Sequence, residues 1–88
     1  RRDYVCSRIA GMGLELVKPE GAFYCFPSIQ KLGMDSETFA MRLLKEAKVA
    51  VVPGKFFDAE GFVRISYCYS DEGLEKGMDR MERFLRSL

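Results

Sequence analysis

Arg64 is the side chain in this sequence with the clearest capacity for chemistry. It stands in the middle of the largely apolar residues 62–67, within a segment, 61–69, that alternates with the period of a β-strand. An arginine in that setting is expected to be at least half-buried, and a buried guanidinium is costly without an anion beside it. Its planar fork suits a carboxylate. Three interpretations are open: an internal Asp or Glu pairs with Arg64, Arg64 lies on an exposed sheet face, or Arg64 anchors the carboxylate of a substrate.

Two further motifs have catalytic or ligand-binding spacing but lack the context that such chemistry needs. Ser28-x-x-Lys31 has the spacing of some nucleophile motifs, but it lies in a polar loop with nothing to desolvate the lysine. Gly11-x-Gly13 follows a predicted helix, precedes a predicted strand and lacks a third glycine, so it does not indicate a dinucleotide site. We interpret the first as a solvated loop and the second as a helix end.

Histidine is absent from the sequence, and this removes the commonest general base near neutral pH. The three cysteines, Cys6, Cys25 and Cys68, are widely spaced and form no CxxC pair. Without histidine, a zinc site would need unusual ligands. The pattern favours reduced and mostly buried thiols, no metal site and a cytoplasmic location.

The composition is that of one folded domain. The 88 residues are 48% hydrophobic and 31% charged, with a net charge of +1. This near-neutral balance argues against nucleic-acid binding, and the apolar runs are too short to span a membrane. No signal peptide is visible. The first residues, Arg1-Arg2 rather than Met, lead us to expect a piece of a longer chain.

Hydrophobic spacing predicts alternating helices and short strands. We expect α/β architecture, an α+β two-layer sandwich with a small mixed sheet of about four strands and helices packed on one side. The compact runs at 22–26 and 49–52 predict buried strands, the first of them buried on both faces. The expected helices are residues 1–12, 36–47 and the segment after Ser70, and the expected strands are 14–17, 22–26, 49–52 and 61–69.

Several segments together resemble the carboxy-terminal small domain of class I/II aminotransferases, which are fold-type I pyridoxal-phosphate enzymes. The aspartate-aminotransferase-like group is the closer match, and the resemblance covers nearly the whole chain, residues 1–88. The order and spacing of the segments carry it. They are Arg1-Arg2-Asp3, Lys18-Pro19-Glu20-Gly21-Ala22-Phe23-Tyr24, Phe39-Ala40 through Leu44, Val51-Val52-Pro53-Gly54 and Val63-Arg64-Ile65-Ser66-Tyr67.

The resemblance implies roles for two residues. Arg64 matches the arginine that clamps the substrate α-carboxylate, and Phe23 matches an aromatic residue near the substrate, although for Phe23 we favour a phenylalanine in the core of a strand. The Schiff-base lysine, the phosphate-binding residues and the aspartate that pairs with the pyridine nitrogen belong upstream in the large domain. We therefore expect no catalytic, cofactor-binding or metal-binding residue in this chain, no bound cofactor, and no activity of the isolated fragment.

The resemblance also implies what the full-length enzyme does. It would transfer an amino group between an amino acid and a 2-oxo acid in amino acid metabolism, using pyridoxal 5'-phosphate, as a cytoplasmic homodimer. This domain would close on the enzyme's own large domain and bring Arg64 to the substrate. Two alternatives are open: a stand-alone α/β regulatory or interaction module that binds a small carboxylate or a protein partner, and an RNA-binding α/β sandwich, which the neutral charge disfavours.

Overall fold

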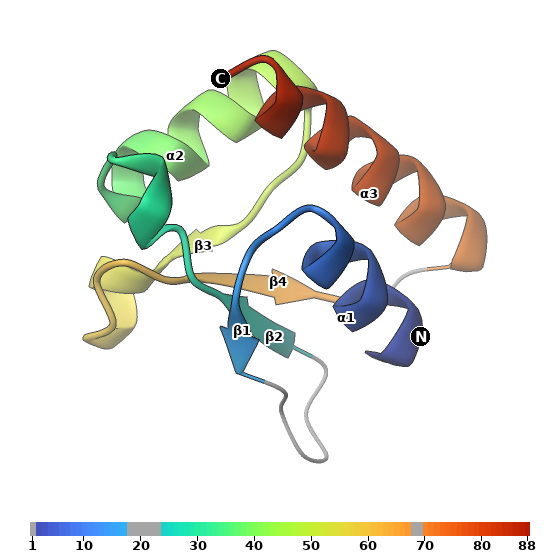
Figure 1. Ribbon diagram of the computed structural model, residues 1–88, viewed down its shortest axis with the longest axis horizontal. Coiled ribbons are helices and arrows are strands. Elements are labelled where there is room, and N and C mark those ends of the chain that lie inside the picture. Colours follow the sequence, from blue (N-terminus) through green and yellow to red (C-terminus); the bar gives the residue numbers. More distant parts are fainter. Residues whose placement is uncertain (1, 18–23, 68–69) are drawn as a thin grey trace.

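The computed structural model describes residues 2–17, 24–67 and 70–88, which fold into a small sheet and helices packed against it (Figure 1). The predicted order of helices and strands is confirmed over this part of the chain. Short turns complete it: the 3₁₀ turns η1 (Gln30–Leu32) and η3 (Gly54–Phe57) and the π-helical turn η2 (Leu43–Ala47). The main elements are α1 (Arg2–Gly11), β1 (Leu16–Val17), β2 (Tyr24–Pro27), α2 (Ser36–Arg42), β3 (Val52–Pro53), β4 (Val63–Ser66) and α3 (Asp71–Arg86).

The sheet has four strands in the order β1-β2-β4-β3, and each neighbouring pair is antiparallel. The α/β class and the number of strands are confirmed, but the expectation of a mixed sheet is wrong. The reason is the position of β4. The crossover from β2 through α2 to β3 makes these two strands run parallel, as the alternation of strand and helix predicts. However, β4 lies between them and pairs antiparallel with both.

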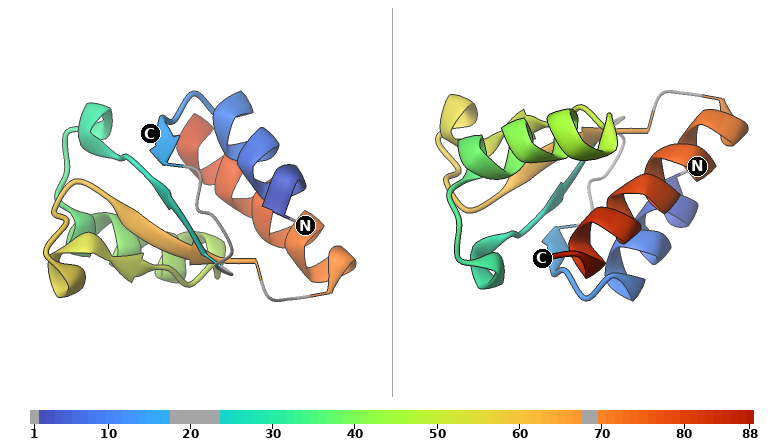
Figure 2. Two further views of the ribbon diagram at one scale, coloured as in Figure 1. Left: turned by 90° about the horizontal axis from the view of Figure 1, so that it is seen from below. Right: turned by 90° about the horizontal axis from the view of Figure 1, so that it is seen from above.

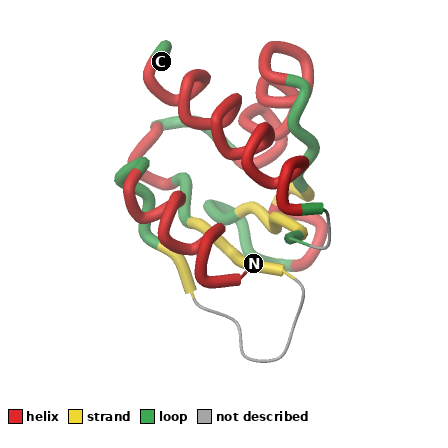
Figure 3. Tube along the Cα trace, turned by 90° about the vertical axis from the view of Figure 1, so that its right-hand side faces the viewer, coloured by secondary structure: helices red, strands yellow, loops and turns green. Residues whose placement is uncertain are grey.

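The helices pack on one side of the sheet and share a single core with it. In Figure 1, α2 and α3 lie above the strands, and α1 runs beside α3, as Figures 2 and 3 show from other directions. Every main helix and the two central strands contribute to this core. Its fully buried side chains include Val5 and Ile9 of α1, Cys25 of β2, Phe39 of α2, Leu43 of η2, Val63 of β4 and Met81 of α3.

Side chains alternate between the two faces of β4, as the sequence predicts. Val63 and Ile65 are buried in the core, whereas Arg64 and Ser66 are half-buried on the opposite face. The strand pairs with a neighbour along each edge. Arg64 is therefore presented from a central strand of the sheet and not from a loop.

The two segments expected as buried strands are only partly so. Tyr24 of β2 keeps 38% of its surface exposed while Cys25 is fully buried, and residues 22–23 lie outside the described residues. The regular part of β3 is Val52–Pro53, which is half-buried, and Ala50 before it is exposed. Both strands belong to a sheet that the described helices cover on one face. A compact apolar run does not by itself show whether a strand is covered on one face or buried on both.

The last helix has a defined start and a broader apolar face than its spacing indicated. A serine directly before a helix with Asp71 and Glu72 in its first turn is typical of an N-cap. The structure confirms this cap: the hydroxyl of Ser70 accepts a hydrogen bond from the amide of Gly73 at 3.1 Å. The apolar residues Leu74, Met78, Met81, Leu85 and Leu88 recur at helical spacing and predict the buried face of this helix. Phe84, which this spacing omits, is buried and packs edge-to-face on Phe39 with 5.9 Å between ring centroids. Leu88, which the spacing includes, is 47% exposed because it lies beyond the end of α3.

A polar cluster ties the start of α2 to the loop between β3 and β4. Ser36 is fully buried, and its amide and hydroxyl donate to the two carboxylate oxygens of Glu60 at 2.7 and 2.9 Å. The same hydroxyl accepts from the amide of Lys55 at 3.2 Å. These hydrogen bonds, chiefly that of the Ser36 amide, lower the pKa of Glu60 below its ordinary value. The loop that leads into β4 is therefore fixed to a helix by a charged group.

Candidate functional site

Arg64 lies among aromatic side chains on the face of the sheet away from the core. The carbon at the centre of its guanidinium is 4.5 Å from the ring centroid of Tyr24 on β2 and 5.8 Å from that of Phe57 at the end of η3. Phe26, also on β2, packs edge-to-face against Phe57 with 5.7 Å between centroids. Aromatic faces attract a cation, so these contacts restrict the guanidinium without using its hydrogen-bond donors.

A tight loop brings Phe57 to this position. Gly54 begins η3, and a Cβ atom there would collide with the backbone carbonyl oxygens of Ala59 and Phe62. Only glycine allows the loop to fold back this closely. The Pro53-Gly54 segment therefore places an aromatic ring beside Arg64.

The charge of Arg64 has no counter-ion within residues 2–17, 24–67 and 70–88. Its Nε atom is buried without a hydrogen-bond partner. None of the ion pairs between described residues includes it. A buried donor left without an acceptor costs about 1–3 kcal/mol. The described residues thus do not supply the internal Asp or Glu of the first interpretation, and the guanidinium is suited to an anion from outside them, above all a carboxylate.

An apolar hollow of about 290 Å³ adjoins this arrangement. It is lined by Phe26, Phe57, Ala59 and Phe62. Phe57 belongs both to the hollow and to the surroundings of Arg64. A cationic donor at the edge of an aromatic surface matches a small molecule that has a carboxylate at one end and an apolar body.

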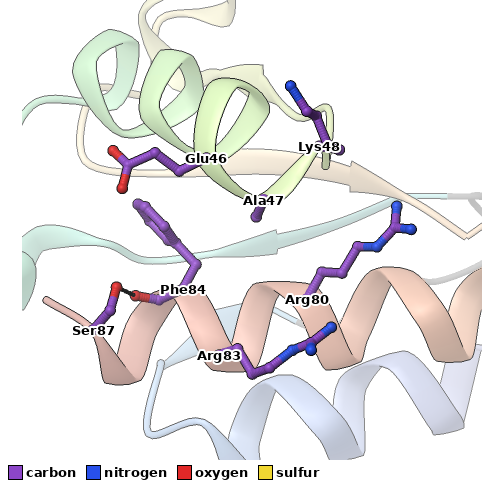
Figure 4. A pocket seen from close by; sticks show the side chains of 7 residues that line it. All are labelled: Glu46, Ala47, Lys48, Arg80, Arg83, Phe84 and Ser87. Atoms are coloured by element: carbon purple, nitrogen blue, oxygen red, sulfur yellow. Dashed lines mark hydrogen bonds between the residues drawn. The ribbon is translucent and has the colours of Figure 1, made fainter.

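A second hollow, of about 460 Å³, lies between η2 and α3 (Figure 4). Lys48, Arg80 and Arg83 line it together with Glu46, and Phe84 contributes apolar surface. The charged side chains are exposed, so water solvates them without a ligand. Arg64 does not line this hollow. The chemistry predicted from the sequence therefore belongs to the sheet face and not to the space between the helices.

Of the other residues considered from the sequence, Ser28 and Lys31 lie in a loop away from Arg64. Phe23 lies outside the described residues. Lys31 is exposed and its ammonium group donates to the carbonyl oxygen of Gly13, while the hydroxyl of Ser28 lies 3.4 Å from the amide nitrogen of Gln30. This environment is the solvated loop that we expected.

Sequence analysis did not identify Tyr24 and Phe57 as neighbours of Arg64. For Tyr24, the signal is the register of the sheet: Tyr24 pairs with Ser66, which shares a face with Arg64. This register cannot be predicted from a single sequence, because it depends on which strands become neighbours in the sheet. For Phe57, the approach depends on the folding of η3, which has no comparable sequence signature.

The thiols and acidic groups of the described residues show no sign of a second reactive centre. Cys6 and Cys25 are free and buried, and burial raises the pKa of the Cys25 thiol to about 12. Cys68 lies outside the described residues. Among the residues that the structure describes, no group of three or more His, Cys, Asp or Glu side chains is placed to hold a metal ion. No described helix has the length and apolar character needed to cross a membrane.

Comparison with known proteins identifies the family. The profile for "Aminotransferase class I and II" matches residues 1–81. The chain belongs to this family.

Individual relatives agree in sequence and in structure. The chain is 54% identical over 88 residues to an aspartate aminotransferase of Pyrococcus abyssi and 52% identical over 87 residues to a probable N-acetyl-LL-diaminopimelate aminotransferase of Bacillus subtilis. These matches cover 98% and 97% of the chain but 23% and 22% of the two relatives. The crystal structure of an aromatic aminotransferase from Pyrococcus horikoshii matches with a TM-score of 0.94 at 52% identity, over 98% of this chain and 24% of that one. The chain thus spans less than a quarter of the length of these relatives.

Proposed function

We propose that residues 1–88 are the carboxy-terminal small domain of a longer pyridoxal-phosphate-dependent aminotransferase and that Arg64 binds the α-carboxylate of its amino acid and 2-oxo acid substrates. One observation carries the proposal: the guanidinium of Arg64 is oriented by aromatic rings, and no described carboxylate neutralises it. The two oxygen atoms of a carboxylate can accept two parallel hydrogen bonds from such a guanidinium.

The names of the relatives support a role in binding what different substrates share. They specify aspartate, aromatic amino acids and an N-acetylated diaminopimelate. The side chains of these compounds differ, but each carries an α-carboxylate. An arginine within the shared segment that recognises the carboxylate would serve all of them, and holding it by two hydrogen bonds would fix the substrate relative to the reacting atoms.

The described residues do not fit the binding of pyridoxal phosphate itself. A lysine that forms a Schiff base needs burial or neighbouring cations to lower the pKa of its amine. The described lysines, Lys31, Lys45, Lys48, Lys55 and Lys76, are all exposed. We therefore assign the cofactor to the rest of the longer chain and propose that the isolated 88 residues are inactive.

The homodimeric state and the cytoplasmic location stay predictions.

The open face of the sheet is the side from which a substrate and the rest of the enzyme would approach. Arg64 and Tyr24 lie on this face, and the described helices pack on the other. Approach of a large domain would remove water from around the guanidinium and strengthen its hydrogen bonds to a carboxylate. Arg64 would then bind and orient the substrate without itself exchanging a proton.

The test is substitution of Arg64 in the full-length enzyme. Arg64→Ala should lower kcat/KM by about 3–5 kcal/mol in transition-state stabilisation, because a charged partner of the carboxylate is lost. Arg64→Lys should recover little, since an ammonium group lacks the planar fork. Arg42→Ala is the control, because Arg42 also faces a ring, that of Phe84 at 5.5 Å, but is paired with Glu46. An unchanged kcat/KM for Arg64→Ala would remove Arg64 from the site.

A further inference from the structure

We infer that Tyr24 is a positioning residue for Arg64, and that its ring holds the guanidinium in the orientation in which it receives a carboxylate. The inference rests on the proposed function of Arg64 and adds a residue that acts through it. Tyr24 approaches from a different strand, so its contribution depends on the pairing of β2 with β4.

The distance between the two groups is the first argument. The guanidinium carbon of Arg64 is 4.5 Å from the ring centroid of Tyr24, whereas the other described cation–ring distances lie between 5.5 and 5.8 Å. The attraction between a cation and a ring face falls with separation. The contact with Tyr24 is therefore the closest of its kind in the described part of the chain.

The absence of other anchors is the second argument. Arg8 and Arg42 are held by carboxylates at 2.8 and 2.9 Å, which fix their guanidinium groups directly. Arg64 has no such ion pair among the described residues, and its Nε atom donates no hydrogen bond there. Before a ligand arrives, aromatic rings are what restrict its rotation. Without the nearer ring, the guanidinium would have more orientations to lose on binding a carboxylate, and affinity would fall.

The exposure of Tyr24 makes its role testable apart from folding. Its side chain is 38% exposed on the open face of the sheet, so its removal leaves no cavity in the core. Phe57 is less suitable for this test because its ring also packs on Phe26. The contact with Arg64 is made through the ring face, so phenylalanine at position 24 should retain it.

The experiment uses the full-length enzyme and three substitutions. Tyr24→Leu should raise KM for the amino acid substrate, and the dissociation constant of maleate or 3-phenylpropionate as unreactive carboxylates, by about 3- to 30-fold. Tyr24→Phe should stay close to the unmodified enzyme. Tyr4→Leu is the matched control, because Tyr4 is 37% exposed and its ring lies 5.8 Å from the Arg8 guanidinium, which carboxylates already hold. It should leave both quantities unchanged.

A double-mutant cycle separates the inference from the proposed function. If Tyr24 acts through Arg64, Tyr24→Leu should have no further effect on carboxylate affinity in the Arg64→Ala background. If Arg64→Ala weakens binding but Tyr24→Leu has no effect, or has the same effect in both backgrounds, the inference is overturned and the function of Arg64 stands. If Arg64→Ala leaves binding intact, the proposed function is wrong and this inference falls with it.

Discussion

Among the described residues, Arg8 and Arg64 each have a tyrosine ring beside the guanidinium, and they differ in whether a carboxylate compensates their charge. Arg8 of α1 reaches across to α3 and donates to Asp79 at 2.8 Å and to Glu82 at 3.1 Å, with Tyr4 at its side. These contacts, first among them the hydrogen bond to Asp79, raise the pKa of Arg8 above its ordinary value. Arg64 has the closer ring but no carboxylate from the described residues.

The difference separates an arginine that holds the fold together from one that is available for binding. The ion pairs of Arg8 join two helices far apart in sequence and leave little donor capacity free. Aromatic rings orient the guanidinium of Arg64, but no described carboxylate compensates its charge. This arrangement lowers the stability of the folded protein in the absence of a ligand. Such a cost is expected at a site where a ligand supplies the missing group.

The largest difference should appear when each arginine is replaced by methionine. Arg8→Met should lower the free energy of unfolding by about 2 kcal/mol, because two carboxylates lose their partner. Arg64→Met should leave it unchanged or raise it by about 1 kcal/mol, since an unsatisfied buried donor is removed. Urea denaturation of the full-length protein measures both. Equal losses would mean that Arg64 has a structural partner and would end the comparison.

A smaller loss in the free energy of unfolding is expected on replacing Ser36, whose hydrogen bonds hold the loop between β3 and β4. Ser36→Ala should lower the free energy of unfolding by about 1 kcal/mol, because the buried hydroxyl donates to Glu60 and accepts from Lys55. Ser28→Ala is the control, as its hydroxyl makes a single long contact with the described residues, at 3.4 Å. If the two variants unfold at the same denaturant concentration, the hydrogen bonds of Ser36 to Glu60 and Lys55 do not stabilise the loop.

The smallest effect should be a change in pH dependence on replacing Glu60. Its pKa is lowered in the folded protein, so its stabilising contribution is full above the ordinary pKa and is lost as pH falls through the lowered value. Glu60→Gln should therefore lower the melting temperature near neutral pH, and the difference from the unmodified protein should shrink in acid. Glu75→Gln, at an exposed glutamate of α3, is the control. A difference that is constant with pH would show that the charge of Glu60 does not contribute.

The sequence predicted most reliably those features that depend on local alternation or on a local cap. The alternation through residues 62–67 correctly placed Arg64 on the face opposite Val63 and Ile65. Ser70 caps α3 as its type and position indicate. These features could be predicted because a strand or a helix end repeats the same geometry wherever it occurs.

Features that depend on which elements become neighbours could not be predicted in the same way. The insertion of β4 between β2 and β3 turns an expected mixed sheet into an antiparallel one. It also brings Tyr24 beside Arg64, on the face of the sheet that the described helices do not cover. Spacing within the aromatic run contains no information on the strand that pairs with it, so half of the candidate site emerged only with the fold.

The pairing of β4 along both edges has a consequence for motion. The Cα atom of Arg64 cannot shift on its own without breaking ladder hydrogen bonds to β2 or to β3. A shift of the Arg64 backbone towards a substrate therefore requires β4 to move together with β2 and β3 as one body, about hinges outside these strands. Amide hydrogens within β4 should then exchange with solvent only at the slow rate of complete unfolding, whether or not the arginine is engaged.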